Sequence, residues 1–275
     1  MAHTPLEQPP TSHTGRTAMD VALDAAQAAG QILRDRFLTS LQISFKGRAD
    51  IVTDVDLAVE KTILALLQRE YPEFGILAEE SKPVETASPY TWVVDPLDGT
   101  RNYSMGIPHF CTVVALARDG DMVLGVTSDP VRQEVFTAEA GRGAFLNGQP
   151  LSITDKQEID EAVLGFDLGY VDEKAGLALD MVRSLWPGIQ GFRLMGSAAL
   201  GLAYAAAGRV DMYFHHALSP WDTASGLVLV REAGGQVVDR QGNPAGLHTP
   251  SVIASSAHLI GRFLQATDGL PWRDG

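Results

Sequence analysis

The sequence predicts a layered α/β fold in two parts that meet near residue 150, and two patterns support this prediction. Between residues 110 and 148, β-prone apolar runs alternate with tight-turn signals such as Asn147-Gly148, which is typical of an antiparallel sheet. After residue 160, strand patterns alternate with helix patterns, which favours a more parallel, mixed sheet. The length of 275 residues and the hydrophobic content of 45% suit two closely packed subdomains.

The N-terminal subdomain is expected to cover residues 17–150, after a tail over residues 1–16 that is rich in Pro, Thr, Ser and His and is predicted to be disordered. Apolar residues at helical spacing predict its helices over residues 17–40 and 57–70. Short apolar or alternating runs predict its strands. These runs cover residues 41–45, 74–78, 92–94, 110–118, 122–128 and 134–138, and a meander continues over 141–148.

The C-terminal subdomain is expected to cover residues 151–275 and to combine strands with helices on a mixed sheet. Its predicted strands cover residues 162–167, 189–194, 210–214, 236–239 and 251–254. Its predicted helices cover residues 173–186, 196–207, 220–233 and 258–266. The dipeptide Gly234-Gly235 ends the third of these helices, because glycine readily leaves the helical conformation.

Composition excludes several classes of function. The net charge of -13 and the absence of a Lys/Arg cluster argue against a nucleic-acid partner. No apolar segment is long enough to span a membrane, and no secretory signal pattern is visible. The single cysteine, Cys111, rules out an internal disulfide and lies in an apolar run, so a buried thiol and a cytoplasmic protein are expected. An acidic protein that binds an anionic substrate needs local positive charge, and metal ions supply it.

The stretch from Trp92 to Tyr103 carries the strongest chemical pattern. A short apolar strand ends in two carboxylates, Asp95 and Asp98, and Gly99-Thr100 then opens a short helix. Carboxylates at a strand end bind hard cations such as Mg²⁺, and free N–H groups at a helix start bind phosphate. Asp-Pro-Leu-Asp-Gly is also an ordinary turn sequence, so this stretch alone leaves both interpretations open.

Three further acidic clusters stand at the ends of predicted elements. Asp54 and Asp56 precede the second helix, where capping is as good an explanation as function. Glu79-Glu80 follows a strand, and Asp222 lies at the start of a helix after Pro220. Four such clusters, counted together with Asp95 and Asp98, indicate a shared cleft.

Motifs in this order resemble the inositol monophosphatase family over residues 17–266. The first family signature is similar to Trp92–Thr100, followed by Asn102-Tyr103. The second is similar to Trp221–Gly226, followed by Glu232–Gly235. The segments Val52–Asp56 and Glu79–Ser81 also match. The resemblance implies five alternating layers (αβαβα), Mg²⁺-dependent hydrolysis of a small phosphate monoester, and a homodimer, because family members are often dimers.

The resemblance also implies a set of metal ligands and catalytic groups. Glu79, Asp95 and the carbonyl of Leu97 would bind a first Mg²⁺, and Asp95, Asp98 and Asp222 a second, while a third and weaker ion would also use Glu79. A water on the first metal would be the nucleophile. Thr100 would orient that water and Asp56 would hold the Thr100 hydroxyl. The catalytic residues implied by the resemblance are therefore Glu79, Thr100 and Asp56.

The substrate contacts implied by the resemblance are less specific. Backbone N–H groups of Gly99 and Thr100 would bind phosphate oxygens. The segment that lines the family's substrate pocket corresponds here to Arg193, Gly196, Ser197 and Ala198. His215 occupies the position where many inositol phosphatases have a glutamate, and His216 follows it, so these residues are either rim residues or a sign of another leaving group. Lys46 resembles a family lysine near the metals, and a solvated loop lysine is an equal alternative.

Inositol monophosphate or a related polyol or sugar phosphate is the expected substrate. Histidinol-phosphate phosphatase, fructose-1,6-bisphosphatase and 3′(2′),5′-bisphosphate nucleotidase activities of the same family are alternatives. A non-catalytic protein that binds a partner is an alternative of another class. The residues do not decide the leaving group, the lithium sensitivity, the number of ions used in turnover or the oligomeric state.

Overall fold

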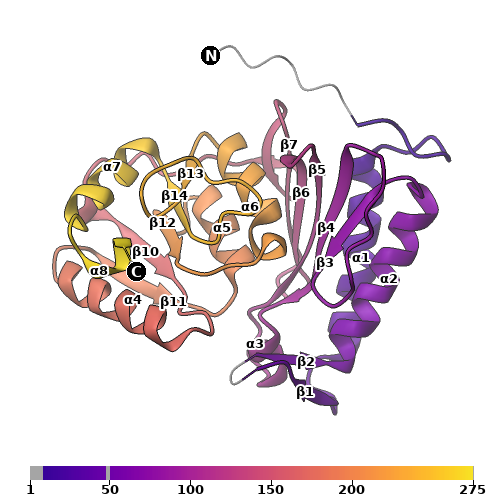
Figure 1. Cartoon of the computed structure of the whole chain (residues 1–275), viewed down its shortest axis with the longest axis horizontal. Coiled ribbons are helices and arrows are strands. Elements are labelled where there is room, and N and C mark those ends of the chain that lie inside the picture. Colours follow the sequence, from indigo (N-terminus) through magenta and orange to yellow (C-terminus); the bar gives the residue numbers. More distant parts are fainter. Residues whose placement is uncertain (1–8, 48–49, 275) are drawn as a thin grey trace.

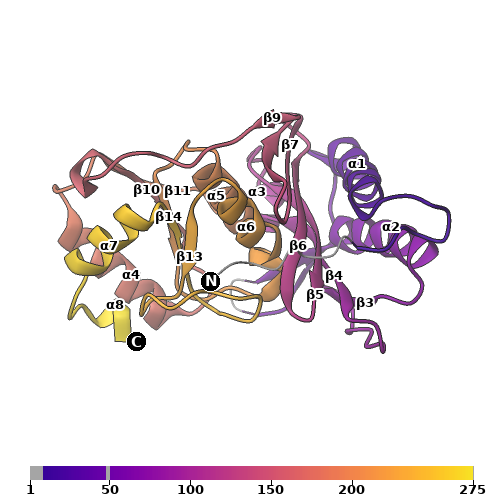
Figure 2. The ribbon, with the colours of Figure 1, turned by 90° about the horizontal axis from the view of Figure 1, so that it is seen from above.

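The computed structural model describes residues 9–47 and 50–274. Helices and sheets alternate in five layers, as Figures 1 and 2 show: a helix pair, a sheet, a second helix pair, a second sheet, and outer helices. Three apolar cores fill the spaces between neighbouring layers. The predicted layered α/β class is confirmed. Within the described residues no helix is both long and apolar enough to cross a membrane.

The first layer is formed by α1 (Ala18–Arg36) and α2 (Asp54–Glu70). Small residues of α1, including Ala22 and Ala29, are fully buried, so this helix packs closely against the sheet and α2. A two-stranded hairpin, β1 (Ile43–Phe45) and β2 (Ile51–Thr53), lies between them in the chain. We expected α2 to begin at residue 57; it begins at Asp54 because Thr53 caps it through a capping box with Asp56.

The predicted disorder of residues 1–16 is wrong for part of that segment. Residues 1–8 lie outside the described part of the chain. Ser12 and Thr14 donate hydrogen bonds to Glu70 Oε2 at 3.1 and 2.5 Å, and His13 Nδ1 lies 3.0 Å from the Glu70 carbonyl oxygen. Residues 12–14 are therefore attached to the C-terminal end of α2.

Within the part of the chain that the structure describes, the first sheet has seven strands in chain order, and only the β3–β4 pair is parallel. The strand bounds are β3 Gly75–Ala78, β4 Tyr90–Asp98, β5 Cys111–Arg118, β6 Asp121–Asp129, β7 Glu134–Glu139, β8 Gly143–Leu146 and β9 Gln149–Pro150. The prediction that this half is antiparallel holds for the meander from β4 to β9. β4 continues past the predicted end at Val94, with a register shift between Asp95 and Asp98, and α3 (Thr100–Ser104) follows it.

The middle layer consists of α5 (Ala198–Ala206) and α6 (Pro220–Glu232), which lie between the two sheets. Almost every residue of α5 is buried, because this helix has apolar neighbours on all sides. Gly125 of β6 permits the close approach of α6, since a Cβ there would lie 2.7 Å from the Cα of Ser225.

The second sheet is mixed, in the strand order β11-β10-β12-β14-β13. β10, β11 and β12 are parallel, and β14 is antiparallel to β12 and β13. The bounds are β10 Val163–Phe166, β11 Gly191–Leu194, β12 Met212–His215, β13 Gln236–Val238 and β14 Val252–Ser255. The outer face carries α4 (Asp172–Leu185), α7 (Ala257–Ala266) and α8 (Pro271–Asp274), and a 3₁₀ turn lies at Ile159–Glu161; the sequence did not predict α8 or this turn.

Candidate metal and phosphate site

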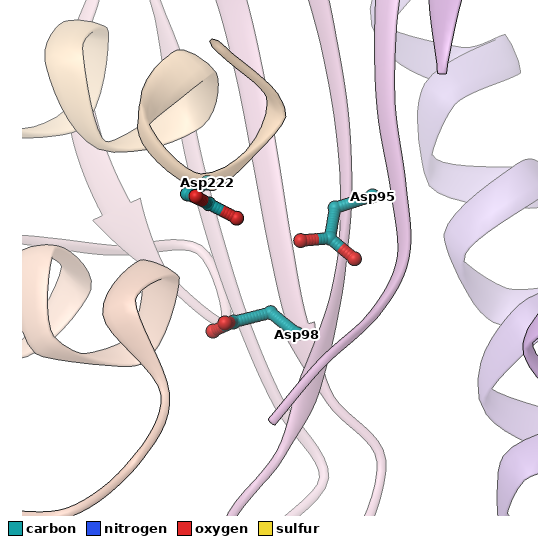
Figure 3. Close-up of side chains that lie close together, drawn as sticks. All are labelled: Asp95, Asp98 and Asp222. Atoms are coloured by element: carbon teal, nitrogen blue, oxygen red, sulfur yellow. The ribbon is translucent and has the colours of Figure 1, made fainter. Parts of the chain in front are cut away.

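Three aspartates from the two halves of the chain meet at the contact between the first sheet and the middle helices. Ligand oxygens of Asp95, Asp98 and Asp222 all lie within 4.8 Å of one another. Figure 3 shows the carboxylates of Asp95, which lies within β4, and Asp222, in the first turn of α6, facing each other, with Asp98, the last residue of β4, beside them. The structure therefore brings together three of the predicted metal-binding side chains.

Local hydrogen bonds orient two of these carboxylates. Asp95 Oδ1 accepts the backbone N–H of Leu97 at 3.0 Å, within the register shift of β4. Asp222 Oδ2 accepts the backbone N–H of Ser219 at 2.7 Å, as part of the capping box of α6. Asp222 thus combines the expected cap with a place in the cluster.

Asp98 connects the two halves of the molecule. Its carboxylate accepts the Ser197 hydroxyl and the backbone N–H groups of Ala198 and Ala199, the latter two at 3.2 and 2.9 Å. These donors form the N-terminus of α5, where a negative charge is favourable. Cys111 is buried, as expected, and its Sγ lies 3.6 Å from Asp98 Oδ2.

The cluster carries more negative charge than its surroundings can balance. Burial, followed by the charges of Glu79, Asp98 and Asp222, raises the pKa of Asp95 well above its usual range. Burial and then Asp98 raise the pKa of Asp222 in the same way. Buried like charges need a cation, and a set of carboxylate oxygens suits a hard divalent ion such as Mg²⁺. The donor set present therefore fits the metal that the sequence predicted.

Glu79 and Lys46 lie at the edge of this site. Glu79 follows β3, and its backbone N–H bonds the Val94 carbonyl at 3.2 Å, beside Asp95. Burial raises the pKa of Glu79 to about 7. Lys46 Nζ lies 2.9 Å from Glu79 Oε1 and 2.5 Å from Glu80 Oε1. Of the two alternatives for Lys46, the structure favours the one that places it near the metal site.

Thr100 and Asp56 are in contact, as the resemblance implied. Thr100 Oγ1 lies 3.0 Å from Asp56 Oδ1 and 2.9 Å from the Leu97 carbonyl oxygen. Asp56 Oδ2 also accepts the Thr53 backbone N–H at 2.9 Å. Capping and the contact with Thr100 therefore coexist in Asp56. Asp54 instead pairs with Arg36 at 2.8 Å.

Gly99 has a backbone that only glycine adopts easily. Its φ is +90°, and a Cβ would lie 3.1 Å from the His109 carbonyl oxygen and 3.2 Å from that of Gly196. The chain can therefore turn directly from Asp98 into α3, and Thr100 reaches Asp56 from the first turn of that helix.

The predicted substrate residues have different surroundings. Ser197 and Ala198 bond Asp98, as described above. Arg193 is exposed, and its Nη1 donates to the carbonyl of the preceding residue, Phe192, at 2.9 Å. His215 lies at the end of β12, stacked on His216 with ring centroids 5.1 Å apart, and burial lowers the pKa of His215 to about 3.

Sequence reasoning missed Asp167 near the site and gave Asn102 no role beyond its place in the first signature. Asp167 follows β10 and accepts the backbone N–H groups of Met195 and Gly196. Asn102 donates to the Met195 carbonyl at 2.7 Å. Asp167 stands at the end of a predicted strand, like the other acids. Sequence reasoning could have found it from that position.

A surface hollow of about 420 Å³ borders the turn at Met195-Gly196. Its lining residues are Asn102, Ile107, His109, Leu194, Met195 and Gly196. None of the three clustered aspartates lines it, so it is distinct from the acidic site.

A layered α/β fold with clustered carboxylates beside helix N-termini can hold divalent metal ions and a phosphate group, as metal-dependent phosphatases do. The chain belongs to the inositol monophosphatase family, whose model matches residues 16–269. This membership supports phosphatase activity in general, and Mg²⁺ is the metal on which the family generally depends.

Individual relatives carry two kinds of name. The chain is 40% identical over 254 residues to "Nus factor SuhB" of Pseudomonas aeruginosa, which covers 90% of this chain and 94% of that protein. It is 39% identical over 245 residues to "Inositol-1-monophosphatase" of Rhizobium meliloti, covering 88% and 92%. The solved structure of extragenic suppressor protein suhB from Bartonella henselae superposes with a TM-score of 0.88, at 37% identity, covering 91% of this chain and 98% of that one.

Proposed function

We propose that this chain is a Mg²⁺-dependent phosphatase of the cytoplasm that hydrolyses a small phosphate monoester, with inositol monophosphate or a related polyol or sugar phosphate as the first candidate. The observation that carries the proposal is the cluster of the buried Asp95 and Asp98 with the half-buried Asp222. A chain without a bound cation would gain nothing from three mutually repelling carboxylates, two of them buried.

The proposed ligands of two or three Mg²⁺ ions are Glu79, Asp95, the Leu97 carbonyl, Asp98 and Asp222. When bound, the ions neutralise phosphate charge and lower the pKa of water. Thr100 donates a hydrogen bond from its hydroxyl to Asp56, which leaves lone pairs on Thr100 Oγ1 to accept a hydrogen bond from the attacking water and so orient it. The N–H groups of Gly99 and Thr100 hold phosphate oxygens, as at other helix N-termini.

The residue expected to face the leaving group differs from that of many inositol phosphatases, because His215 stands where they have a glutamate. His215 Nδ1 accepts the backbone N–H of Ala217 at 3.0 Å, so the proton of the neutral ring is assigned to Nε2. A neutral N–H donor recognises an acceptor, whereas a glutamate recognises a hydroxyl donor. His215 therefore supports keeping histidinol phosphate, fructose 1,6-bisphosphate and 3′-phosphoadenosine 5′-phosphate as candidate substrates.

Phosphate release from inositol 1-phosphate and these three compounds, at fixed Mg²⁺ and with an EDTA control, tests the proposal. We expect one substrate to be hydrolysed fastest and EDTA to abolish its hydrolysis.

Asp95→Asn should lower turnover by several orders of magnitude, because it removes an anionic ligand. Asp54→Asn is the matched control, since Asp54 pairs with Arg36 outside the cluster, and it should stay active. Near-normal Mg²⁺-dependent turnover of Asp95→Asn would contradict the metal assignment.

A second candidate function comes from the relative that is named a Nus factor. Under this alternative the chain binds a protein or nucleic acid of the transcription machinery, contrary to the expectation from its net charge of -13. Transcription elongation and termination by purified RNA polymerase, measured with and without the chain, tests it. An effect that persists in Asp95→Asn would belong to partner binding and not to catalysis.

We also propose a homodimer. Met105, Ile107 and Leu194 are exposed apolar side chains, and the last two line the surface hollow. Exposed apolar side chains gathered at one place often mark an interface. Light scattering coupled to size-exclusion chromatography should give twice the chain mass of 29.5 kDa, and a monomer mass would reject the proposal.

A further inference from the structure

The turn between β11 and α5 is held by side chains from both halves of the molecule. Asp167 Oδ1 accepts the backbone N–H groups of Met195 and Gly196 at 3.0 and 2.6 Å. From the opposite side, Asn102 Nδ2 donates to the Met195 carbonyl at 2.7 Å. Hydrogen bonds therefore hold both backbone N–H groups of this two-residue segment and the carbonyl of Met195.

Tyr213 holds the other oxygen of Asp167. Its hydroxyl donates to Asp167 Oδ2 at 2.9 Å, and its ring is buried between two glycines. A Cβ at Gly201 would lie 2.2 Å from the ring, and one at Gly165 would lie 3.2 Å from it. The glycines leave a slot that fits this ring closely, so the position of the Tyr213 hydroxyl is fixed by packing.

The residues directly after this turn hold Asp98. Ser197, Ala198 and Ala199 donate to its carboxylate, as described above. A displacement of Gly196 would therefore carry these three donors with it. A continuous series of contacts runs from Tyr213 through Asp167 and the turn to Asp98.

We propose that Asp167 and Tyr213 are positioning residues of the metal site, which act by fixing the turn whose donors orient Asp98. The inference rests on the proposed function, because it takes Asp98 as a metal ligand. Groups that orient a ligand without touching the metal commonly change metal affinity by about 10- to 100-fold when they are removed.

The experiment measures binding of Mg²⁺ alone to the full-length chain by isothermal titration calorimetry. Tyr213→Phe removes one hydroxyl and should weaken binding roughly tenfold. Asp167→Ala should weaken Mg²⁺ binding at least as much. This variant loses the two hydrogen bonds from the turn and also the one from Tyr213. Asp167→Asn keeps an acceptor oxygen for the two N–H groups, and its amide NH₂ can donate to the Tyr213 hydroxyl oxygen, so it should bind close to wild type. If the charge of Asp167 mattered instead of its contacts, the Asn variant would bind as weakly as the Ala variant.

Two controls separate positioning from damage to the fold. Tyr204→Phe is the matched variant on α5, since Tyr204 contacts His109 and not Asp167, and it should bind Mg²⁺ normally. Excess Mg²⁺ should restore turnover of the leading panel substrate by Tyr213→Phe. Because Mg²⁺ also stabilises the folded chain, this recovery supports positioning only if the variant is already folded in EDTA. Thermal unfolding without metal identifies any variant that fails to fold. If either Tyr213→Phe or Asp167→Ala fails, the Mg²⁺ affinity of the other variant tests the positioning role.

The outcomes distinguish this inference from the proposed function. Normal Mg²⁺ binding by Tyr213→Phe and Asp167→Ala, together with weak binding by Asp98→Asn, would overturn the positioning role and leave the metal site intact. Normal binding by Asp98→Asn would overturn the ligand assignment itself. Weak binding by Asp98→Asn, Tyr213→Phe and Asp167→Ala, with recovery in Asp167→Asn, is the expected result.

Discussion

His109 is a buried residue whose protonation should affect stability. Its Nε2 has no hydrogen-bond partner among the described residues, and its ring packs edge-on against Tyr204. Burial, and then the charge of Arg132, lowers the pKa of His109 to about 4 from the ordinary 6.5. Below pH 6.5 the unfolded chain therefore takes up a proton that the folded chain does not. The contribution of His109 to stability is present above pH 6.5 and is lost as the pH falls toward 4.

His109→Phe should remove this dependence while keeping the ring contact. At low pH the free energy of unfolding of wild type should fall relative to that of the variant by about 1.4 kcal/mol per pH unit. Urea unfolding of both proteins in EDTA at a series of pH values between 7 and 4.5 measures the difference. His215 and His216 contribute equally to both proteins and cancel. Parallel stability profiles would show that His109 is protonated in the folded chain.

At the scale of elements, the contact between β6 and α6 depends on the absence of a side chain at Gly125. A Cβ there would lie 2.7 Å from the Ser225 Cα and 2.8 Å from Val228 Cγ1. Gly125→Ala should destabilise the chain by about 1–3 kcal/mol, because α6 must move away from the sheet.

The same substitution at Gly176 should have the opposite sign. Gly176 lies inside α4, and a Cβ there would meet nothing within 4 Å. Gly176→Ala should therefore stabilise by about 0.4–1 kcal/mol. Urea unfolding of the two variants and wild type measures both effects. Similar stabilities for the two variants would mean that α6 accommodates the added methyl group without moving.

Hydrophobic periodicity predicted most of the elements, and it failed where polar residues belong to an element. Asp54 and Asp56 resemble a loop in sequence, yet they form the first turn of α2 because acids are favourable there. Pro96 suggests the end of a strand, yet β4 continues to Asp98 through a register shift.

The site was predictable only in part. The strand-end and helix-start positions of Asp95, Asp98 and Asp222 identified them in advance, and the structure clusters them. Their supporting contacts were not predictable, because Asp98 receives donors from residues 99 to 101 positions away in the chain. Periodicity describes neighbours along one element and carries no information on such pairs. Asp167 and Tyr213 were missed for the same reason.

At the scale of the whole molecule, metal binding should stabilise the fold. Asp95 and Asp98 belong to the N-terminal half and Asp222 to the C-terminal half, so the proposed ligand set forms only in the folded chain. Mg²⁺ at about 100 times its dissociation constant should add about 2.7 kcal/mol to the free energy of unfolding. Thermal unfolding in Mg²⁺ and in EDTA measures this shift, and Asp222→Asn should reduce it. A melting temperature that is unaffected by Mg²⁺ would argue against this site.

The position of α5 and α6 between the two sheets also matters while the protein is being made. The chain is synthesised from its N-terminus. The strands β4, β5 and β6 are therefore complete at Asp129, well before residues 198–232 are available to cover them. Asp95 and Asp98 likewise appear before Ser197 and Asp222. A nascent chain that stalls near residue 150 therefore presents a bare apolar sheet face and two unmatched carboxylates, and chaperones and proteases act on surfaces of this kind.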